Sequence, residues 1–98
     1  MYARVARWEG DKEALDAMVE RIREDSAQGP PEGIPAKGLM LLRSLDGGAT
    51  VAVALFETED DLRTGDATLN SMSPPADAGP IRRTSVDLTE AALELSAD

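Results

Sequence analysis

The chain has 98 residues, about the size of one domain, and its 19 acidic side chains outnumber its 10 basic ones, which gives a net charge of −9. A charge of that sign disfavours nucleic acid and anionic membrane surfaces, so we expect neither as a partner. Because the sequence contains neither cysteine nor histidine, it excludes thiol nucleophiles, disulfides, histidine bases and most zinc or heme ligation. We therefore predict a single domain over residues 1–98, with no metal site and no cofactor.

A strand and a helix are predicted first. Residues 2–8 alternate β-branched and aromatic side chains loosely before Gly10, which is typical of a strand. Charged residues interrupt this segment, so it resembles neither a signal peptide nor a membrane span, and we expect a cytoplasmic protein. The helix begins with Gly10 or Asp11 as its cap and ends before Gly29-Pro30-Pro31. Its apolar stripe has helical spacing, and the intervening charged residues, Arg23 among them, are predicted to face water; the stripe is Leu15, Met18, Val19 and Ile22.

The middle of the chain predicts a β-hairpin. Two apolar runs, residues 37–45 and 50–56, flank Asp46-Gly47-Gly48, whose glycines can adopt the positive φ that a tight turn needs. Apolar residues occupy both the odd-numbered and the even-numbered positions of these strands, so both faces of the hairpin are apolar. If Leu39 and Leu41 face the helices, Met40 and Leu42 face the other way.

A second helix and a last strand complete the chain. Thr58 is the predicted cap, with Asp61 three residues later, and Pro74-Pro75 end the helix. Residues 82–95 alternate polar and apolar side chains, as expected of a strand, and the end from residue 90 either continues it or forms a short helical tail. The apolar side of the second helix is thin, because the small Gly65 lies among its members, Leu62, Leu69 and Met72.

The order of these elements predicts an α+β fold, a ferredoxin-like βαββαβ domain with a four-stranded antiparallel sheet and both helices on one face. The other face would then expose the second apolar side of the hairpin. Burying one such side chain stabilises a protein by roughly 1.5 to 3 kcal/mol, so leaving several exposed is unfavourable. We therefore expect a homodimer through the sheet face, with the sheets of two copies packed together.

The hairpin over residues 38–56, its exit through Phe56-Glu57-Thr58 into an acidic helix start, and the closing strand over residues 85–95 resemble the dimeric α/β-barrel superfamily. The antibiotic-biosynthesis-monooxygenase-like branch is the most similar. The resemblance implies a homodimeric barrel. Heme-degrading members are expected to use a histidine ligand, which this sequence lacks. Monooxygenase members commonly place tryptophan and asparagine near a pocket between helices and sheet, where this chain offers Phe56 and its only asparagine, Asn70.

The candidate substrate-binding residues have structural alternatives. Arg4 shares strand parity with Trp8 and is suited to hold a substrate oxygen, but it can equally pair with Glu57 or Asp87 on a neighbouring strand. Those two carboxylates are the plausible general bases only if they are buried. Trp8 can also simply cap the core. Asn70 can reflect the polar C-terminal end of the helix, and Met72 can fill space in the packing. The full set of candidates is Arg4, Trp8, Phe56, Asn70 and Met72.

Two functions agree with these observations. The first is a homodimeric module that binds a small apolar ligand, or has a structural or regulatory role, without turnover. The alternative is a cofactor-independent monooxygenase or isomerase that acts on an aromatic or quinol-type substrate. The sequence leaves open whether the protein is an enzyme, because its catalytic residues are not identifiable.

Overall fold

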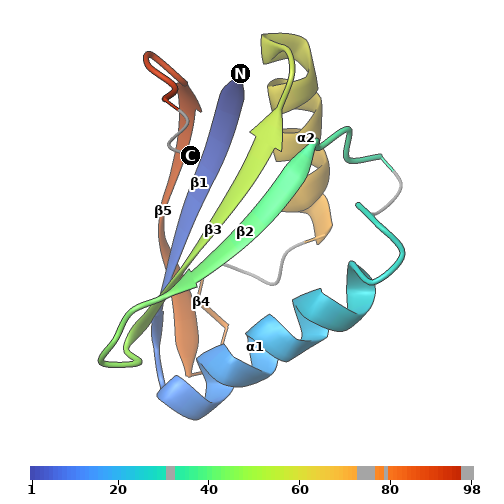
Figure 1. Cartoon of the computed structure of the whole chain (residues 1–98). Coiled ribbons are helices and arrows are strands. Elements are labelled where there is room, and N and C mark those ends of the chain that lie inside the picture. Colours follow the sequence, from blue (N-terminus) through green and yellow to red (C-terminus); the bar gives the residue numbers. More distant parts are fainter. Residues whose placement is uncertain (31–32, 73–76, 79, 96–98) are drawn as a thin grey trace.

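The computed structural model describes residues 1–30, 33–72, 77–78 and 80–95. All strands pair antiparallel in the order β2-β3-β1-β5-β4, and both helices cover one face of the sheet (Figure 1). The predicted ferredoxin-like α+β fold is therefore confirmed, with β4 as an additional strand of two residues at one edge. The elements are β1 (Tyr2–Gly10), α1 (Lys12–Asp25), β2 (Gly38–Arg43), β3 (Ala49–Phe56), α2 (Glu59–Met72), β4 (Asp77–Ala78) and β5 (Ile81–Glu90).

The register of β1 assigns side chains to the two faces of the sheet. Arg4 lies opposite Ala54 of β3 and Leu88 of β5, and residues directly opposite in antiparallel strands point to the same face. Arg4 and Ala54 are both buried beneath the helices. The shared parity predicted for one side of β1 is confirmed, since the helix face carries Tyr2, Arg4, Ala6 and Trp8.

Both predicted helix caps are present. The side chain of Asp11 accepts a hydrogen bond from the backbone N–H of Glu13 at 3.2 Å, which satisfies a donor that the first turn of α1 leaves free. The hydroxyl of Thr58 accepts from the backbone N–H of Asp61 at 3.0 Å and does the same for α2. The predicted stripe of α1 packs inward, with Leu15 and Val19 buried.

Helix α2 packs closely on the sheet because Gly65 has no side chain. A Cβ atom at this position would overlap the ring of Phe56, which is fully buried. The ring therefore occupies the space that a side chain on α2 would need, and the helix approaches the strands closely. The core cluster at this contact consists of Ile34, Ala54, Phe56 and Leu62.

The hairpin turn is longer than predicted. β2 ends at Arg43, so Leu45, which we placed in the strand, lies fully exposed in the turn. The reason is a hydrogen-bond network around Asp46, which accepts from the Gly48 N–H and from the Ser44 hydroxyl, both at 2.8 Å. The bond from Gly48 first, and then that from Ser44, lower the pKa of Asp46. Gly47 adopts a φ of 82°, as the turn requires of a glycine.

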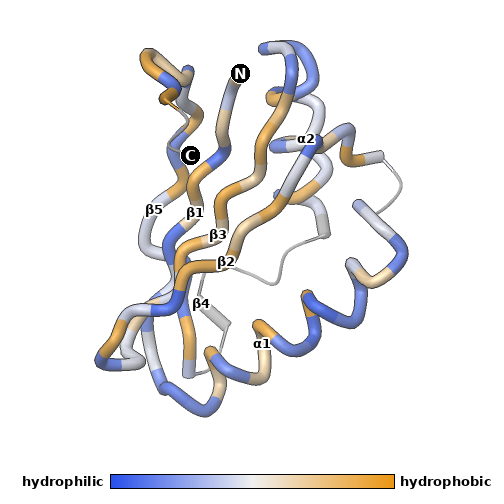
Figure 2. The backbone as a smooth tube through the Cα atoms, viewed as in Figure 1, coloured by the Kyte–Doolittle hydropathy of each residue, from blue (hydrophilic) through white to orange (hydrophobic). Residues whose placement is uncertain are grey.

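The face of the sheet opposite the helices is apolar at β2 and β3 and polar at β5. Met40 is 54% and Leu42 47% exposed on β2. The apolar colouring continues along β3, and the same face of β5 carries Ser85, Asp87 and Thr89 (Figure 2). The prediction that the hairpin is hydrophobic on both sides is therefore confirmed, and the apolar surface of this face gives way to polar residues at β5.

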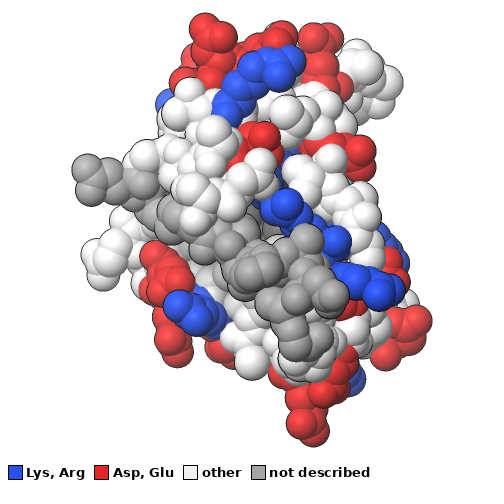
Figure 3. Space-filling view, turned by 180° about the vertical axis from the view of Figure 1, so that it is seen from behind, with Lys and Arg blue, Asp and Glu red and all other residues white. Residues whose placement is uncertain are grey.

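Ionisable side chains of both signs are spread over the molecule. In the view of Figure 3, acidic side chains occur at the top, sides and bottom, with basic side chains between them. Among the described helices, none has the length and apolar character needed to cross a membrane. After β5 ends at Glu90, residues 91–95 form neither a strand nor a helix, so both predictions for this segment are wrong.

Candidate functional site

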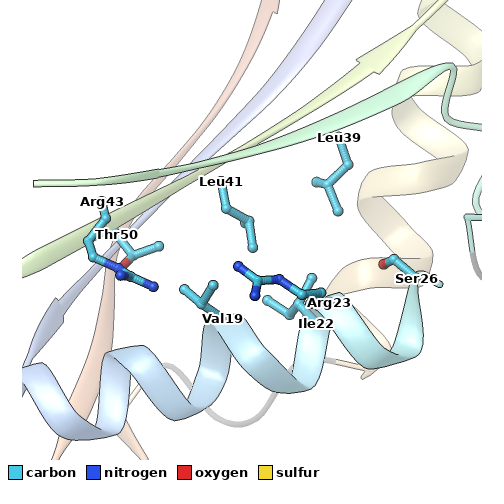
Figure 4. A pocket seen from close by; sticks show the side chains of 8 residues that line it. All are labelled: Val19, Ile22, Arg23, Ser26, Leu39, Leu41, Arg43 and Thr50. Atoms are coloured by element: carbon cyan, nitrogen blue, oxygen red, sulfur yellow. The ribbon is translucent and has the colours of Figure 1, made fainter.

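An open pocket of about 440 Å³ lies between α1 and the strands β2 and β3 (Figure 4). A volume of this size is within the range of small-molecule sites. Its apolar walls come from the stripe of α1 and from the helix-facing side of β2, and they consist of Val19, Ile22, Leu39 and Leu41. Its polar lining consists of Arg23, Ser26, Arg43 and Thr50.

Strand register and helical spacing explain how these side chains meet. Leu41 lies opposite Ala52 and Arg43 lies opposite Thr50, so both β2 residues point toward α1. On α1, Val19 and Arg23 are four residues apart and therefore neighbours on the helix surface. The leucine side chains point down from β2 and the α1 side chains point up, with open space between them (Figure 4).

The charged lining of the pocket is cationic. The guanidinium groups of Arg23 and Arg43 both lie in the gap between β2 and α1 (Figure 4). Arg43 Nε contacts an oxygen of Asp16 at 3.2 Å, and Arg23 contacts one of Glu20 at 3.0 Å. The pKa of Asp16 is lowered, first by a hydrogen bond from Lys12 and also by the charge of Arg43. Within the part of the chain that the structure describes, no acidic side chain lines the pocket itself.

Thr50 adds an unsatisfied polar atom at the Arg43 end of the pocket. Its side chain is among the most buried in the protein, with 1% of its surface exposed. The hydroxyl oxygen has no hydrogen-bond partner among the described residues.

The predicted residue Arg4 lies outside this pocket, in a contact between β1 and α2. Its Nε donates to Asp66 at 2.8 Å, and its Nη2 donates to Asn70 at 3.0 Å. Arg83 donates to the same Asn70 oxygen at 3.0 Å. The structure thus brings together two of the predicted residues, Arg4 and Asn70, and adds Asp66, whose spacing of four residues from Asn70 on a helix was the available signal.

The predicted ion-pair partners of Arg4 are wrong. Arg4 faces the helices, whereas Asp87 lies opposite Val5 and faces the other side of the sheet. Glu57 instead contacts Lys37 at 3.5 Å. Both carboxylates are exposed, so the burial that a general base would need is absent at these two positions.

The other predicted residues are distributed over the core and the end of α2. Trp8 is buried in β1 beside Thr50, and Phe56 forms the centre of the core. Neither lines the pocket. Met72 is the last residue of α2, and its side chain lies outside the described residues.

The residues that line the pocket were only partly visible in the sequence. The stripe of α1 was identified, but as core, and Arg23 was predicted to face water. Arg23 is exposed, as predicted, and its guanidinium also lies in the gap between α1 and β2 (Figure 4). Arg43, which shares its parity with Leu39 and Leu41 in an apolar strand, was the overlooked signal. Within the described residues, no group of three or more Asp or Glu side chains forms a metal-binding cluster.

No protein-family model matches the sequence, and no curated protein matches it. Solved structures do. The heme-degrader MhuD from Mycobacterium tuberculosis, with two hemes bound in its active site, matches with a TM-score of 0.67 and 16% identity, covering 98% of this chain and 100% of that one. A mutant of MhuD with two manganese protoporphyrin IX molecules per active site matches with a TM-score of 0.66 and 18% identity, covering 99% and 100%. At such identities the likeness shows the fold alone, and this fold is the one that the predicted resemblance implied.

Proposed function

We propose that this protein binds a small, largely apolar molecule in the pocket between α1 and the sheet, and that it does so as a homodimer. The observation that carries this proposal is the pocket itself, about 440 Å³ of open space beside the buried core of a small domain. A pocket of this volume is within the range of small-molecule sites, and because it is open to solvent a ligand can enter it.

The MhuD structures contain porphyrins in their active sites, and porphyrins are flat and mainly apolar. A ligand of that general character is therefore the one to compare with the pocket of this protein. Protein ligands to heme iron are usually histidine, cysteine, methionine or tyrosine side chains. The first two are missing from the sequence, and none of the four types occurs among the described residues that line the pocket. We therefore propose a ligand that is held by its apolar surface and not by a bond to a metal.

Blocking the pocket tests the binding proposal. The Ile22→Trp variant places an indole in the opening and is expected to abolish binding of pyrenebutanol, a neutral fluorescent probe whose emission reports transfer from water to an apolar site. Ala17→Trp, at an exposed position of the same helix, is the matched control and should bind as the wild type does. Equal probe affinity in the wild type and the Ile22→Trp variant would contradict the proposal.

The homodimer is proposed from the sheet face opposite the helices. Met40 and Leu42 are about half exposed there, beside the half-buried valines of β3. A second copy offers the same apolar half-face, so two copies related by a twofold axis bury one another. The polar residues of β5 would lie toward the rim of such an interface.

Light scattering tests the dimer. We expect the wild type at twice the 10.4 kDa mass of one chain at micromolar concentration. Leu42→Glu should shift the species toward one chain, because it places a charge in the apolar interface. Leu45→Glu is the matched control, since Leu45 is fully exposed in the hairpin turn, outside the proposed interface. A folded wild type of 10.4 kDa would overturn the dimer and leave the pocket proposal standing.

A substrate-binding role for Arg4, Trp8, Phe56, Asn70 and Met72 stays a prediction. The polar members, Arg4 and Asn70, are hydrogen-bonded to each other where α2 meets β1. This contact accounts for them as groups that position α2. No observation in the described residues favours the monooxygenase or isomerase alternative over ligand binding.

A further inference from the structure

We infer that the ligand of the pocket is an anionic amphiphile, an apolar body that carries a carboxylate, and that Arg23 and Arg43 hold its charged group. This inference rests on the proposed binding function and specifies the chemical class of the ligand. Its basis is the charge of the pocket lining, the geometry of the two guanidinium groups and the division of the lining into an apolar and a polar part.

The charge of the lining is opposite to that of the protein. Acidic residues outnumber basic ones 19 to 10 in the sequence, yet the ionisable side chains that line the described pocket are Arg23 and Arg43. Each arginine has a carboxylate neighbour that does not itself line the pocket, Asp16 for Arg43 and Glu20 for Arg23. Because the chain has a net charge of −9, its overall electrostatic field repels an anion. Local attraction by Arg23 and Arg43 is therefore needed for an anion to bind in the pocket.

Both guanidinium groups have donors left for a ligand. A guanidinium carries five N–H groups in a rigid, planar arrangement that suits a carboxylate. The contact of Arg43 with Asp16 is made by Nε, and that of Arg23 with Glu20 by one terminal nitrogen. These ion pairs are solvent-exposed, and exposed pairs contribute little, so they oppose a ligand only weakly. A carboxylate between α1 and β2 would be less hydrated and more strongly bound.

The remaining lining suits an apolar body. Val19 and Ile22 of α1 face Leu41 of β2 across the pocket (Figure 4). Leu39 is 48% exposed at the far end, so the pocket stays open to solvent on that side. Arg43, which lies opposite Thr50, makes the other end of the pocket the polar one.

A matched pair of probes tests this inference. Pyrenebutanoate and pyrenebutanol share one apolar body and differ in the charge of the end group. We expect wild-type protein to bind the acid roughly tenfold to a hundredfold more tightly than the alcohol, which is the range for hydrogen bonds to charged groups. Arg23→Gln and Arg43→Gln should each remove most of that preference, and dodecanoate should displace the acid. Arg21→Gln is the control, because Arg21 on the same helix is 85% exposed and does not line the pocket.

The outcomes separate the two proposals. Equal affinity for acid and alcohol, both lost in Ile22→Trp, would overturn the anionic class and keep the pocket as an apolar site. A preference for the acid that survives both pocket-arginine variants, or that Arg21→Gln removes equally, would also overturn the assignment. If neither probe binds, the binding function itself fails and the inference falls with it. Circular dichroism of each variant ensures that a lost affinity is not a lost fold.

Discussion

The two helices lie on the same face of one sheet, yet they pack against it very differently. α2 is in close contact with the strands: Gly65 lies against the Phe56 ring, and Asp66 forms an ion pair with the buried Arg4 at 2.8 Å. α1 makes buried contacts through Leu15 and Val19, but toward its C-terminal end it leaves the pocket open.

Residue size and charge explain the difference. On α2, Gly65 allows the helix to approach the sheet closely. Asp66 neutralises the charge of Arg4, the only arginine buried among the described residues. At the border of α1, the long side chains of Arg23 on this helix and Arg43 on β2 keep their guanidinium groups hydrated, which tight packing would prevent. A helix can thus serve stability or keep a space open, depending on the few residues that point toward the sheet.

The largest expected effect tests the packing itself. Phe56→Ala should lower the free energy of unfolding by about 3 to 5 kcal/mol, because it empties the centre of the α2 contact. Leu41→Ala, on the α1 side, should cost less than half of that, since its neighbours already border open space. Urea denaturation of both variants measures the two values. Similar losses would show that the two helices are equally well packed and would contradict the comparison.

A smaller effect is expected for the ion pair of α2. Asp66→Asn preserves the shape of the side chain but leaves the guanidinium of Arg4 buried without a carboxylate, so we expect a loss of about 2 kcal/mol in the free energy of unfolding. Asp25→Asn is the control, because its contact with Arg21 is 4.0 Å long and exposed on both sides, and such pairs contribute almost nothing. If both variants unfold at the same urea concentration, Asp66 does not stabilise α2.

Much of the fold was predictable because it depends on local patterns. The caps Asp11 and Thr58 and the apolar parity of the hairpin each require only a few neighbouring residues, and all are confirmed. The turn was predicted too short, since the Ser44–Asp46 network that ends β2 early depends on side-chain geometry. For the same reason, the partner of Arg4 was sought on adjacent strands and was found on a helix 62 residues further along the chain.

The sequence by itself determined the order of the four long strands and two helices, the faces of the sheet, the absence of histidine and cysteine side chains, and the acidic charge. Periodicity and composition carry that information residue by residue. Only the tertiary structure decided which helix packs tightly and which leaves a pocket. That outcome depends on how the stripe of α1 and the side chains of β2 meet across a gap, and no local pattern encodes the width of a gap between segments far apart in the chain.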